Sequence, residues 1–598
     1  ISTPLMASLT APKWIFLEDP NWGARSVDPP EAIFFRQLPA IGAVIREAAQ
    51  NSLDARDPDL DPSTPVRMRF SIHRGDHALP SDKARTYLDG LDEHLVASEL
   101  DPIPDLQDGM PYLVVEDFGT LGLVGEAGPD AERDDEKNRF YWFHRNVNRT
   151  QRNTKRGGSY GYGKASFSLA SAVRSFITVS HGVDGTMRVF GNSIAKTHEI
   201  DGRAFGSYGD FGIHHQIEGR GDGALPCEDL DFFRSVCSDF SLLREQSPGL
   251  SVIVPLPERS YSVAEIAQSA IRNYLMPICQ GKIIFEIGDC NSPPIEINRS
   301  SVKHISSRLE WSGEIAGAMS QTSRNSMDAM IDLALWWDEQ GADAAYSLGT
   351  LTESEPHWYP SLIPEEILET LKGKLAVGEP IALRAKLPIR KLDQRTTDEG
   401  SFTILLMKRE DQGPSDALWF RKYISVPNRK ELFSNNGYAA ITIADEGCIL
   451  EDMLRLSEEV AHTNHEYQLV NESFKYARGS IRFYRTAGKY LLEYLTRESP
   501  EIEEGWLSDW FPTEESQPDK TNPRRTRRRS RRSKKNDPDD DEVIGPLQPP
   551  EDLSRNHSWD VHKRADGFSI EGSITHDLDY TFTVKTAYAR DDGKKPLR

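Results

Sequence analysis

Glu47-Ala48-Ala49-Gln50-Asn51-Ser52-Leu53-Asp54-Ala55 is a stretch in which polar side chains recur at helical spacing. Glu47, Asn51 and Asp54 stand at positions i, i+4 and i+7, and these offsets place all three on one face of an α-helix. A carboxylate and an amide one turn apart can divide a task, because the carboxylate orients a water molecule while the amide oxygen holds a hard cation. A solvated helix face is the alternative, but the dense alanine and leucine around these positions weaken it.

The surrounding pattern predicts a mixed domain. An apolar stripe predicts a helix over residues 31–56, with Pro39 indicating either a kink or two shorter helices. Alternation predicts a strand at 66–72, and a second strand at 113–115 ends in the acidic pair Glu116-Asp117. Further helices are predicted at 81–100, 134–148 and 165–172, and further strands at 175–180 and 251–254.

A second motif, Asp117-Phe118-Gly119-Thr120-Leu121-Gly122-Leu123, follows a predicted strand. Glycine lets the backbone approach a flat ring closely, and the carboxylate can accept a hydrogen bond from an exocyclic amine. A plain β-turn built on Asp and Gly explains the same residues equally well. The letters DFG also occur in protein kinases, but the strand lysine and HRD loop of that family do not accompany them in the right order.

Two glycine-containing stretches complete the pattern. Gly157-Gly158-x-x-Gly161-x-Gly163-Lys164 precedes a predicted helix, and its backbone N–H groups suit a polyphosphate. Its spacing differs from that of a Walker A loop, and a flexible glycine-rich loop is the alternative. Gly249-Leu250-Ser251-Val252 opens a strand, and its hydroxyl could meet the same phosphates, although a simple turn before a strand explains it too.

In this order, and within residues 30–257, the motifs resemble the GHKL ATPase superfamily of gyrase B, MutL, the histidine kinases and the MORC proteins. The resemblance implies a Bergerat-fold α/β sandwich that binds ATP and Mg²⁺ beneath a mobile lid. It implies that Glu47 is the general base, that Asn51 is the Mg²⁺ ligand and that Asp54 supports the site through hydrogen bonds. It also implies a nucleotide-binding set: Asp117 and Gly119 at the adenine, Gly158, Gly161, Gly163 and Lys164 at the phosphates, and Ser251 where the family usually has Thr.

Within this superfamily the chain looks like the MutL/MORC-like bacterial ATPases linked to restriction and phage-defence operons. In that group a transducer domain follows the ATP domain, and a basic residue from one of its loops completes the γ-phosphate site. Lys391 is the predicted catalytic lysine, and Lys386 and Lys422 compete with it. The resemblance implies an ATP-gated homodimer that acts with a partner protein such as a nuclease. A non-hydrolysing nucleotide-sensing scaffold and a chaperone-like ATPase are the alternatives.

The predicted fold class is α+β, and the predicted organisation has six parts. These are an N-terminal arm (1–30), a GHKL ATP-binding domain (31–257), a transducer-like α+β domain (258–465), a helical segment (466–512), a disordered charged linker (513–550) and a small β domain (551–598). In the second domain we predict helices at 263–279, 326–337, 364–374 and 449–458, and strands at 282–287, 381–387, 402–407 and 439–443. A long helix follows at 467–497, and strands at 568–574 and 580–584 end the chain.

Charge and cysteine content indicate which binding partners and which cellular compartment to expect. The 598 residues carry a formal net charge of −22, which disfavours non-specific binding to nucleic acid. DNA binding would therefore require a local basic patch, and Arg524 to Lys535 provides one. The acidic run Asp537 to Glu542 could instead neutralise this segment as part of a linker, and both interpretations stay open. We expect no membrane span, and five scattered cysteines without a CxxC pair indicate free thiols in a reducing, cytoplasmic compartment.

Overall fold

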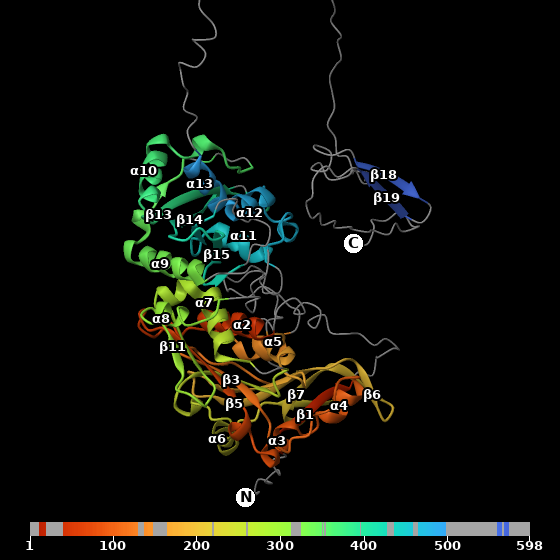
Figure 1. Ribbon diagram of the computed structural model, residues 1–598. Helices are drawn as coiled ribbons and strands as arrows, with labels where there is room; N and C mark the ends of the chain where they lie inside the picture. The colour runs from red at the N-terminus through yellow and green to blue at the C-terminus, as the bar shows by residue number, and fades with distance from the viewer. Residues whose placement is uncertain are drawn as a thin grey trace, which may run out of the picture. The chain divides into compact units, whose positions relative to one another are not determined.

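The computed structural model describes twelve stretches with their side chains and a short hairpin near the C-terminus by its backbone (Figure 1). The stretches are 11–18, 40–128, 137–146, 164–217, 221–258, 261–311, 324–349, 351, 355–394, 396–426, 436–458 and 465–497, and the hairpin comprises 559–564 and 567–572. The chain divides into two units, residues 1–501 and 502–598. The strands and helices given are those that these residues form.

The first unit contains a mixed sheet of eleven strands in the order β1-β7-β5-β4-β9-β3-β2-β10-β11, with β6 and β8 paired to β7. Its strands are β1 (Lys13–Glu18), β2 (Val66–His73), β3 (Tyr112–Phe118), β4 (Ser175–His181), β5 (Met187–Ile194), β6 (His198–Ile200), β7 (Arg203–Ile217), β8 (Gly221–Leu225), β9 (Gly249–Pro255), β10 (Ile283–Gly288) and β11 (Ile295–Ile297). The strands predicted at 66–72, 113–115, 175–180 and 251–254 all belong to it.

Alternating side chains give this sheet two faces, each covered by helices (Figure 1). Val66, Met68, Phe70 and Ile72 of β2 are buried in the core that α2 (Ala40–Asp54), α5 (Ala165–Leu169) and α7 (Val263–Cys279) share. The opposite face packs against α3 (Ser81–Leu88), α4 (Asp92–Ala97) and α6 (Leu230–Asp239). The result is a sheet sandwiched between helices, and α2, which carries Glu47, lies on the first of these faces.

Three predicted helices differ from the observed elements. The helix predicted over 31–56 is α2, which begins at Ala40; residues 31–39, including Pro39, lie outside the described residues. Residues 81–100 form two helices rather than one, because Gly90 between them has a φ of +79° and its α-carbon faces the backbone of Trp14. Within the predicted helix 134–148, Tyr141–Arg145 forms a π-helical turn.

A second sheet has six strands in the order β12-β13-β14-β17-β15-β16. They are β12 (Tyr346–Ser347), β13 (Ile381–Ile389), β14 (Asp398–Lys408), β15 (Asp416–Arg421), β16 (Ile424–Ser425) and β17 (Tyr438–Ala444). One face packs on α10 (Glu365–Ala376), α11 (Ile449–Ser457), α12 (Ala477–Arg485) and α13 (Ala487–Thr496). The other face joins α7, α8 (Val302–Ser306) and α9 (Arg324–Gln340) in the core that α2 also contributes to.

Two expectations about the second module need correction. The strand predicted to open it at 282–287 is β10, which pairs in parallel with β2 and therefore belongs to the first sheet, beyond the predicted boundary at 257/258. The long helix predicted at 467–497 is instead a 3-10 turn at Tyr467–Leu469 followed by two helices, α12 and α13, with a break at Thr486. Tyr476, with a φ of +58°, lies in the left-handed region just before α12, so no helix runs from residue 467 into α12.

The second unit contains one antiparallel hairpin, β18 (Trp559–Arg564) and β19 (Gly567–Gly572). The strand predicted at 568–574 overlaps β19, whereas the strand predicted at 580–584 and the charged linker 513–550 lie outside the described residues. The five cysteines are free thiols, as predicted. No described helix combines the length and the apolar character that crossing a bilayer requires.

Candidate nucleotide site

Helix α2 is fixed to the sheet by its apolar side. Ile41, Val44, Ile45 and Ala49 are fully buried in the core beneath it. Glu47 is 6% exposed, and Asn51 and Asp54 are partly buried on the same helix. Because the apolar side of α2 packs on the core, the side chains of Glu47, Asn51 and Asp54 are held together on another side of the helix, as the spacing in the sequence predicts.

Asp117, at the end of β3, is bound directly to α2. Ser52 Oγ lies 2.8 Å from Asp117 Oδ2, while Thr120 Oγ1 and the backbone N–H of Leu250 donate to Oδ1 over 2.7 Å each. Each carboxylate oxygen offers about two acceptor positions. Oδ1 is therefore saturated, and Oδ2 keeps one position for a further donor. Sequence reasoning missed Ser52, although it stands inside the quoted helical stretch.

The turn after Asp117 is tied to the end of α2. Gly119 has a φ of +79°, a conformation that strongly favours glycine, and its carbonyl accepts the N–H of Asp57 at 3.0 Å. The N–H of Leu121 donates to the carbonyl of Ala55, also at 3.0 Å. These bonds hold the glycine turn against the helix that carries Glu47 and Asn51.

Ser251 lies on the other face of the sheet. It pairs in register with Glu116, the neighbour of Asp117, so the Ser251 side chain points away from α2. It is fully buried and donates to Glu116 Oε1 over 2.8 Å. The structure therefore does not bring Ser251 to the α2 face, where its predicted phosphate contact would be.

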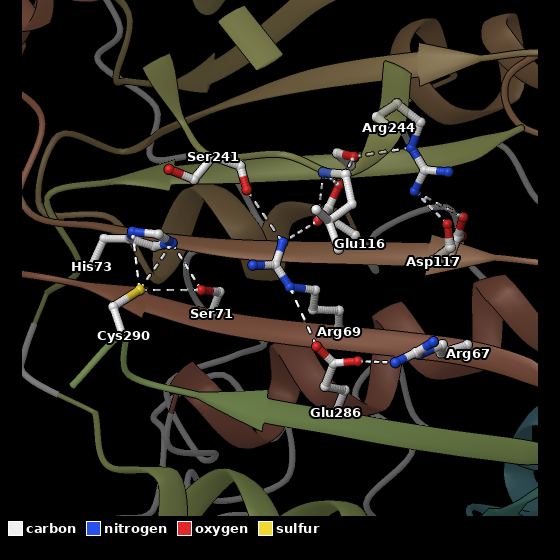
Figure 2. Close-up of polar contacts among 12 residues, drawn as sticks. Arg67, Arg69, Ser71, His73, Glu116, Asp117, Ser241, Arg244, Glu286 and Cys290 are labelled. Atoms are coloured by element: carbon white, nitrogen blue, oxygen red, sulfur yellow. Dashed lines mark hydrogen bonds and ion pairs between the residues drawn. The ribbon is translucent and has the colours of Figure 1, made fainter. Parts of the chain in front are cut away.

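Arg244 supports the strand ends from this far side, as Figure 2 shows. Its guanidinium is fully buried, donates to Ser251 Oγ at 3.0 Å and to the backbone carbonyl of Asp117, and stacks 4.5 Å from the centre of the Phe118 ring. Burial lowers the pKa of Arg244, and the nearby carboxylates of Asp117 and Glu116 oppose this shift. Sequence reasoning missed Arg244, because nothing in the local pattern distinguishes it from a solvated arginine.

A row of ion pairs continues across the neighbouring strands (Figure 2). Arg69 of β2 contacts Glu116 Oε2 at 2.5 Å and Glu286 of β10 at 3.7 Å, and Glu286 also pairs with Arg67. Alternation along β2 places Arg67, Arg69 and His73 on this same face. Burial, with a smaller contribution from Arg69, lowers the pKa of His73 to about 4, so its imidazole is neutral at pH 7.

The predicted phosphate loop is described only at its end. Gly158, Gly161 and Gly163 lie outside the described residues. Lys164 is partly buried and donates from Nζ to the carbonyl of His144 at 3.0 Å, just before α5 begins. His144 is buried between Asn192 and Thr178, and burial lowers its pKa to about 3.

Of the three competing lysines, Lys422 is the one in contact with α2. Its Nζ lies 2.8 Å from Asp54 Oδ1, and it stands in the turn between β15 and β16 with a φ of +54°. Lys391 lies instead against the ring of Phe474 in the second core, and Lys386 pairs with Glu399 at the surface, where both side chains are exposed. The structure thus brings Lys422, rather than Lys391, to the helix of Glu47.

The junction around Lys422 is polar and buried. Arg46, the neighbour of Glu47, donates to Asn273 Oδ1 of α7 at 2.5 Å and to the carbonyl of Ser425 at 2.9 Å. Arg421 forms a bidentate pair with Glu458, with both contacts at 2.7 Å. Helix α2 is therefore bound directly to the second sheet. No group of three or more His, Cys, Asp or Glu side chains suited to a metal ion occurs in the part of the chain that is described.

Comparison with known proteins does not assign the chain to a family. No protein-family model and no curated protein matches the chain. Among solved structures, the ATPase region of Saccharomyces cerevisiae topoisomerase II matches at 10% identity, over 67% of this chain and 72% of that chain, with a TM-score of 0.24. A TM-score this low does not define a common fold.

Proposed function

We propose that α2 and the first sheet form a GHKL-type site that binds ATP with Mg²⁺ and hydrolyses the nucleotide. The observation that carries this proposal is the 2.8 Å contact between Ser52 Oγ and Asp117 Oδ2. It joins the helix of Glu47 and Asn51 to the glycine turn after β3, across a separation of 65 residues. One site then has a carboxylate for base recognition at one end and groups for hydrolysis along the helix.

In this proposal each group on α2 has a distinct task. Glu47 accepts the proton of the attacking water, and Asn51 holds Mg²⁺ through its amide oxygen. Mg²⁺ takes hard oxygen ligands and usually needs only one or two from the protein, so the residues present fit the ion. When bound, it neutralises charge on the phosphates. Asp117 accepts the exocyclic amine of adenine at the remaining position of Oδ2.

In this proposal basic residues bind the phosphates. Lys164, just before α5, binds them together with Gly158, Gly161 and Gly163, which the family resemblance assigns to the phosphate loop. Lys422 takes the role that the sequence predicted for Lys391, because its ammonium group already lies at α2. On nucleotide binding, Lys422 would exchange Asp54 for a phosphate oxygen and stabilise the charge of phosphoryl transfer.

The first test is nucleotide binding by calorimetry with Mg·ATP. The wild-type chain is expected to bind, and Asp117→Asn to bind about 10–150-fold more weakly. The amide can present a donor where the carboxylate accepts, and a hydrogen bond to a charged group contributes about 1.5–3 kcal/mol. Asp343→Asn, in an exposed short turn, is the matched control and should bind like the wild type. Absence of binding heat for the wild type would refute the proposal.

We further propose, from the family resemblance, that ATP closes two copies into a dimer that acts with a partner effector on DNA in anti-phage defence. The second sheet, bound to α2 through Arg46 and Lys422, supplies the means to transmit closure. With a non-hydrolysable ATP analogue, light scattering is expected to report a doubled mass. An unchanged mass with saturating analogue would exclude the clamp, while leaving ATP binding itself intact.

A further inference from the structure

Helix α12 lies in a stretch of unusual charge for this protein. Between Glu472 and Glu493 the sequence contains five basic residues and no acidic one, whereas the whole chain has a formal net charge of −22. The basic residues recur at spacings of three and four, which is the helical repeat. They are Lys475, Arg478, Arg482, Arg485 and Lys489.

The fold exposes two of these residues on one face of α12. Arg478 and Arg482 are exposed there, and four residues of helix separate them by about 6 Å along the axis. Lys475 stands just before α12 and Lys489 in the first turn of α13, each partly exposed. The opposite side of α12 is held in the second core through buried residues such as Ile481. The basic side therefore cannot turn inward.

Four of these five basic residues have no carboxylate at ion-pair distance in the part of the chain that the structure describes. They are Lys475, Arg478, Arg482 and Lys489. Elsewhere the chain neutralises many of its arginines, for example Arg69 by Glu116 and Arg421 by Glu458. Glu355 stands nearby, against Gly479. The positive charge of α12 is therefore largely not neutralised within the chain and can attract an external anion.

A second segment adds to this face. The backbone around Lys391 bonds to residues 473–475, since Leu392 N–H donates to Ser473 and Lys475 N–H donates to Arg390, both at 2.9 Å. Large apolar side chains border it, because Leu392 is 52% exposed and Tyr476 40% exposed. We define the α12 basic surface as Lys391, Lys475, Arg478, Arg482 and Lys489.

We propose that the α12 basic surface binds the backbone of duplex DNA. An acidic protein repels a polyanion everywhere except at such a patch, and regularly spaced arginine and lysine side chains are suited to a row of phosphates. Phosphate contacts position a protein on the duplex without reading its sequence. This surface consists of other residues than Arg524 to Lys535, and the proposal does not depend on the ATP site. It also gives Lys391 a role other than the one predicted for it.

The test is fluorescence anisotropy with a short labelled DNA duplex, without nucleotide, between about 50 and 200 mM salt. The double variant Arg478→Gln/Arg482→Gln is expected to bind more weakly. Its slope of log affinity against log salt should be shallower by about 1.8, or about 0.9 for each lost phosphate contact. Arg478→Lys/Arg482→Lys should restore most of the slope, because the charge is kept.

The matched control is Arg85→Gln/Arg308→Gln, which removes two exposed arginines outside this surface and should leave the slope unchanged. The same series is repeated in a chain lacking residues 523–536. If the Arg478/Arg482 variant matches the control in both backgrounds, or if deletion of 523–536 alone abolishes binding, the proposal is wrong. A slope change that requires Arg478 and Arg482 and survives the deletion supports it. Since no nucleotide is present, failure here says nothing against the ATP site.

Discussion

Replacement of Glu47 by Gln is expected to leave Mg·ATP binding nearly unchanged and to lower the rate of phosphate release by about 10²–10⁴-fold. Glu47 is 6% exposed and lies one helical turn before Asn51, where the proposed site requires a group that orients water beside a bound cation. The amide of Gln keeps the size of the side chain but cannot accept a proton from water. The loss should therefore appear in turnover and not in affinity.

The experiment compares phosphate release and calorimetry for the wild type, Glu47→Gln and Glu365→Gln. Glu365 is exposed in the first turn of α10, so its variant controls for the loss of one negative charge. Equal turnover by Glu47→Gln and the wild type would remove Glu47 from the role of base. A variant that loses affinity and turnover together would indicate that Glu47 shapes the nucleotide pocket instead.

Replacement of Arg421 by Met is expected to destabilise the first unit by about 3–5 kcal/mol. Arg421 and Glu458 are 1% and 0% exposed by side chain and form two contacts of 2.7 Å. Burial lowers the pKa of Arg421, but the carboxylates of Glu458, Glu451 and Asp54 together more than offset this, and the net shift is upward. Methionine has a similar reach, yet it leaves the buried Glu458 carboxylate without its bidentate partner, which is the costly half of such a change.

The measurement is the free energy of unfolding from urea titration. The double variant Arg421→Met/Glu458→Leu is expected to recover much of the loss, since two apolar side chains can replace a buried ion pair at little cost. Lys386→Met is the surface control, because Lys386 and Glu399 are each more than half exposed and such pairs contribute about 0–1 kcal/mol. A double variant no more stable than Arg421→Met, or a control with an equal loss, would contradict this account.

The second replacement also bears on the proposed function, because Arg421 precedes Lys422. The bidentate pair fixes the end of β15 from which Lys422 reaches Asp54 of α2. If Lys422 acts at the γ-phosphate as proposed, Arg421→Met should lower the rate of phosphate release, measured without denaturant, by a larger factor than it lowers nucleotide affinity. Glu47→Gln would lower the same rate by removing the proton acceptor, whereas Arg421→Met would lower it by displacing Lys422.

Much of the local structure was predictable from short-range pattern. Helix α7 has the predicted bounds, and a capping box between Ser262 and Glu265 fixes its start. By contrast, β7 was not predicted, because its glycines lower strand propensity. Two of them, Gly209 and Gly212, face the ring of Phe16 and the backbone of Leu225 so closely that a side chain would collide there. The requirement for glycine came from neighbours remote in the sequence.

The sequence by itself determined the spacing of Glu47, Asn51 and Asp54 on one helix, because helical geometry acts over a few residues. Only the tertiary structure decided that Ser52 contacts Asp117, that Ser251 faces away from α2, and that Lys422 rather than Lys391 reaches Asp54. The Lys422–Asp54 contact spans 368 residues. Such pairs depend on how two sheets pack around a shared core, and no local periodicity encodes that packing.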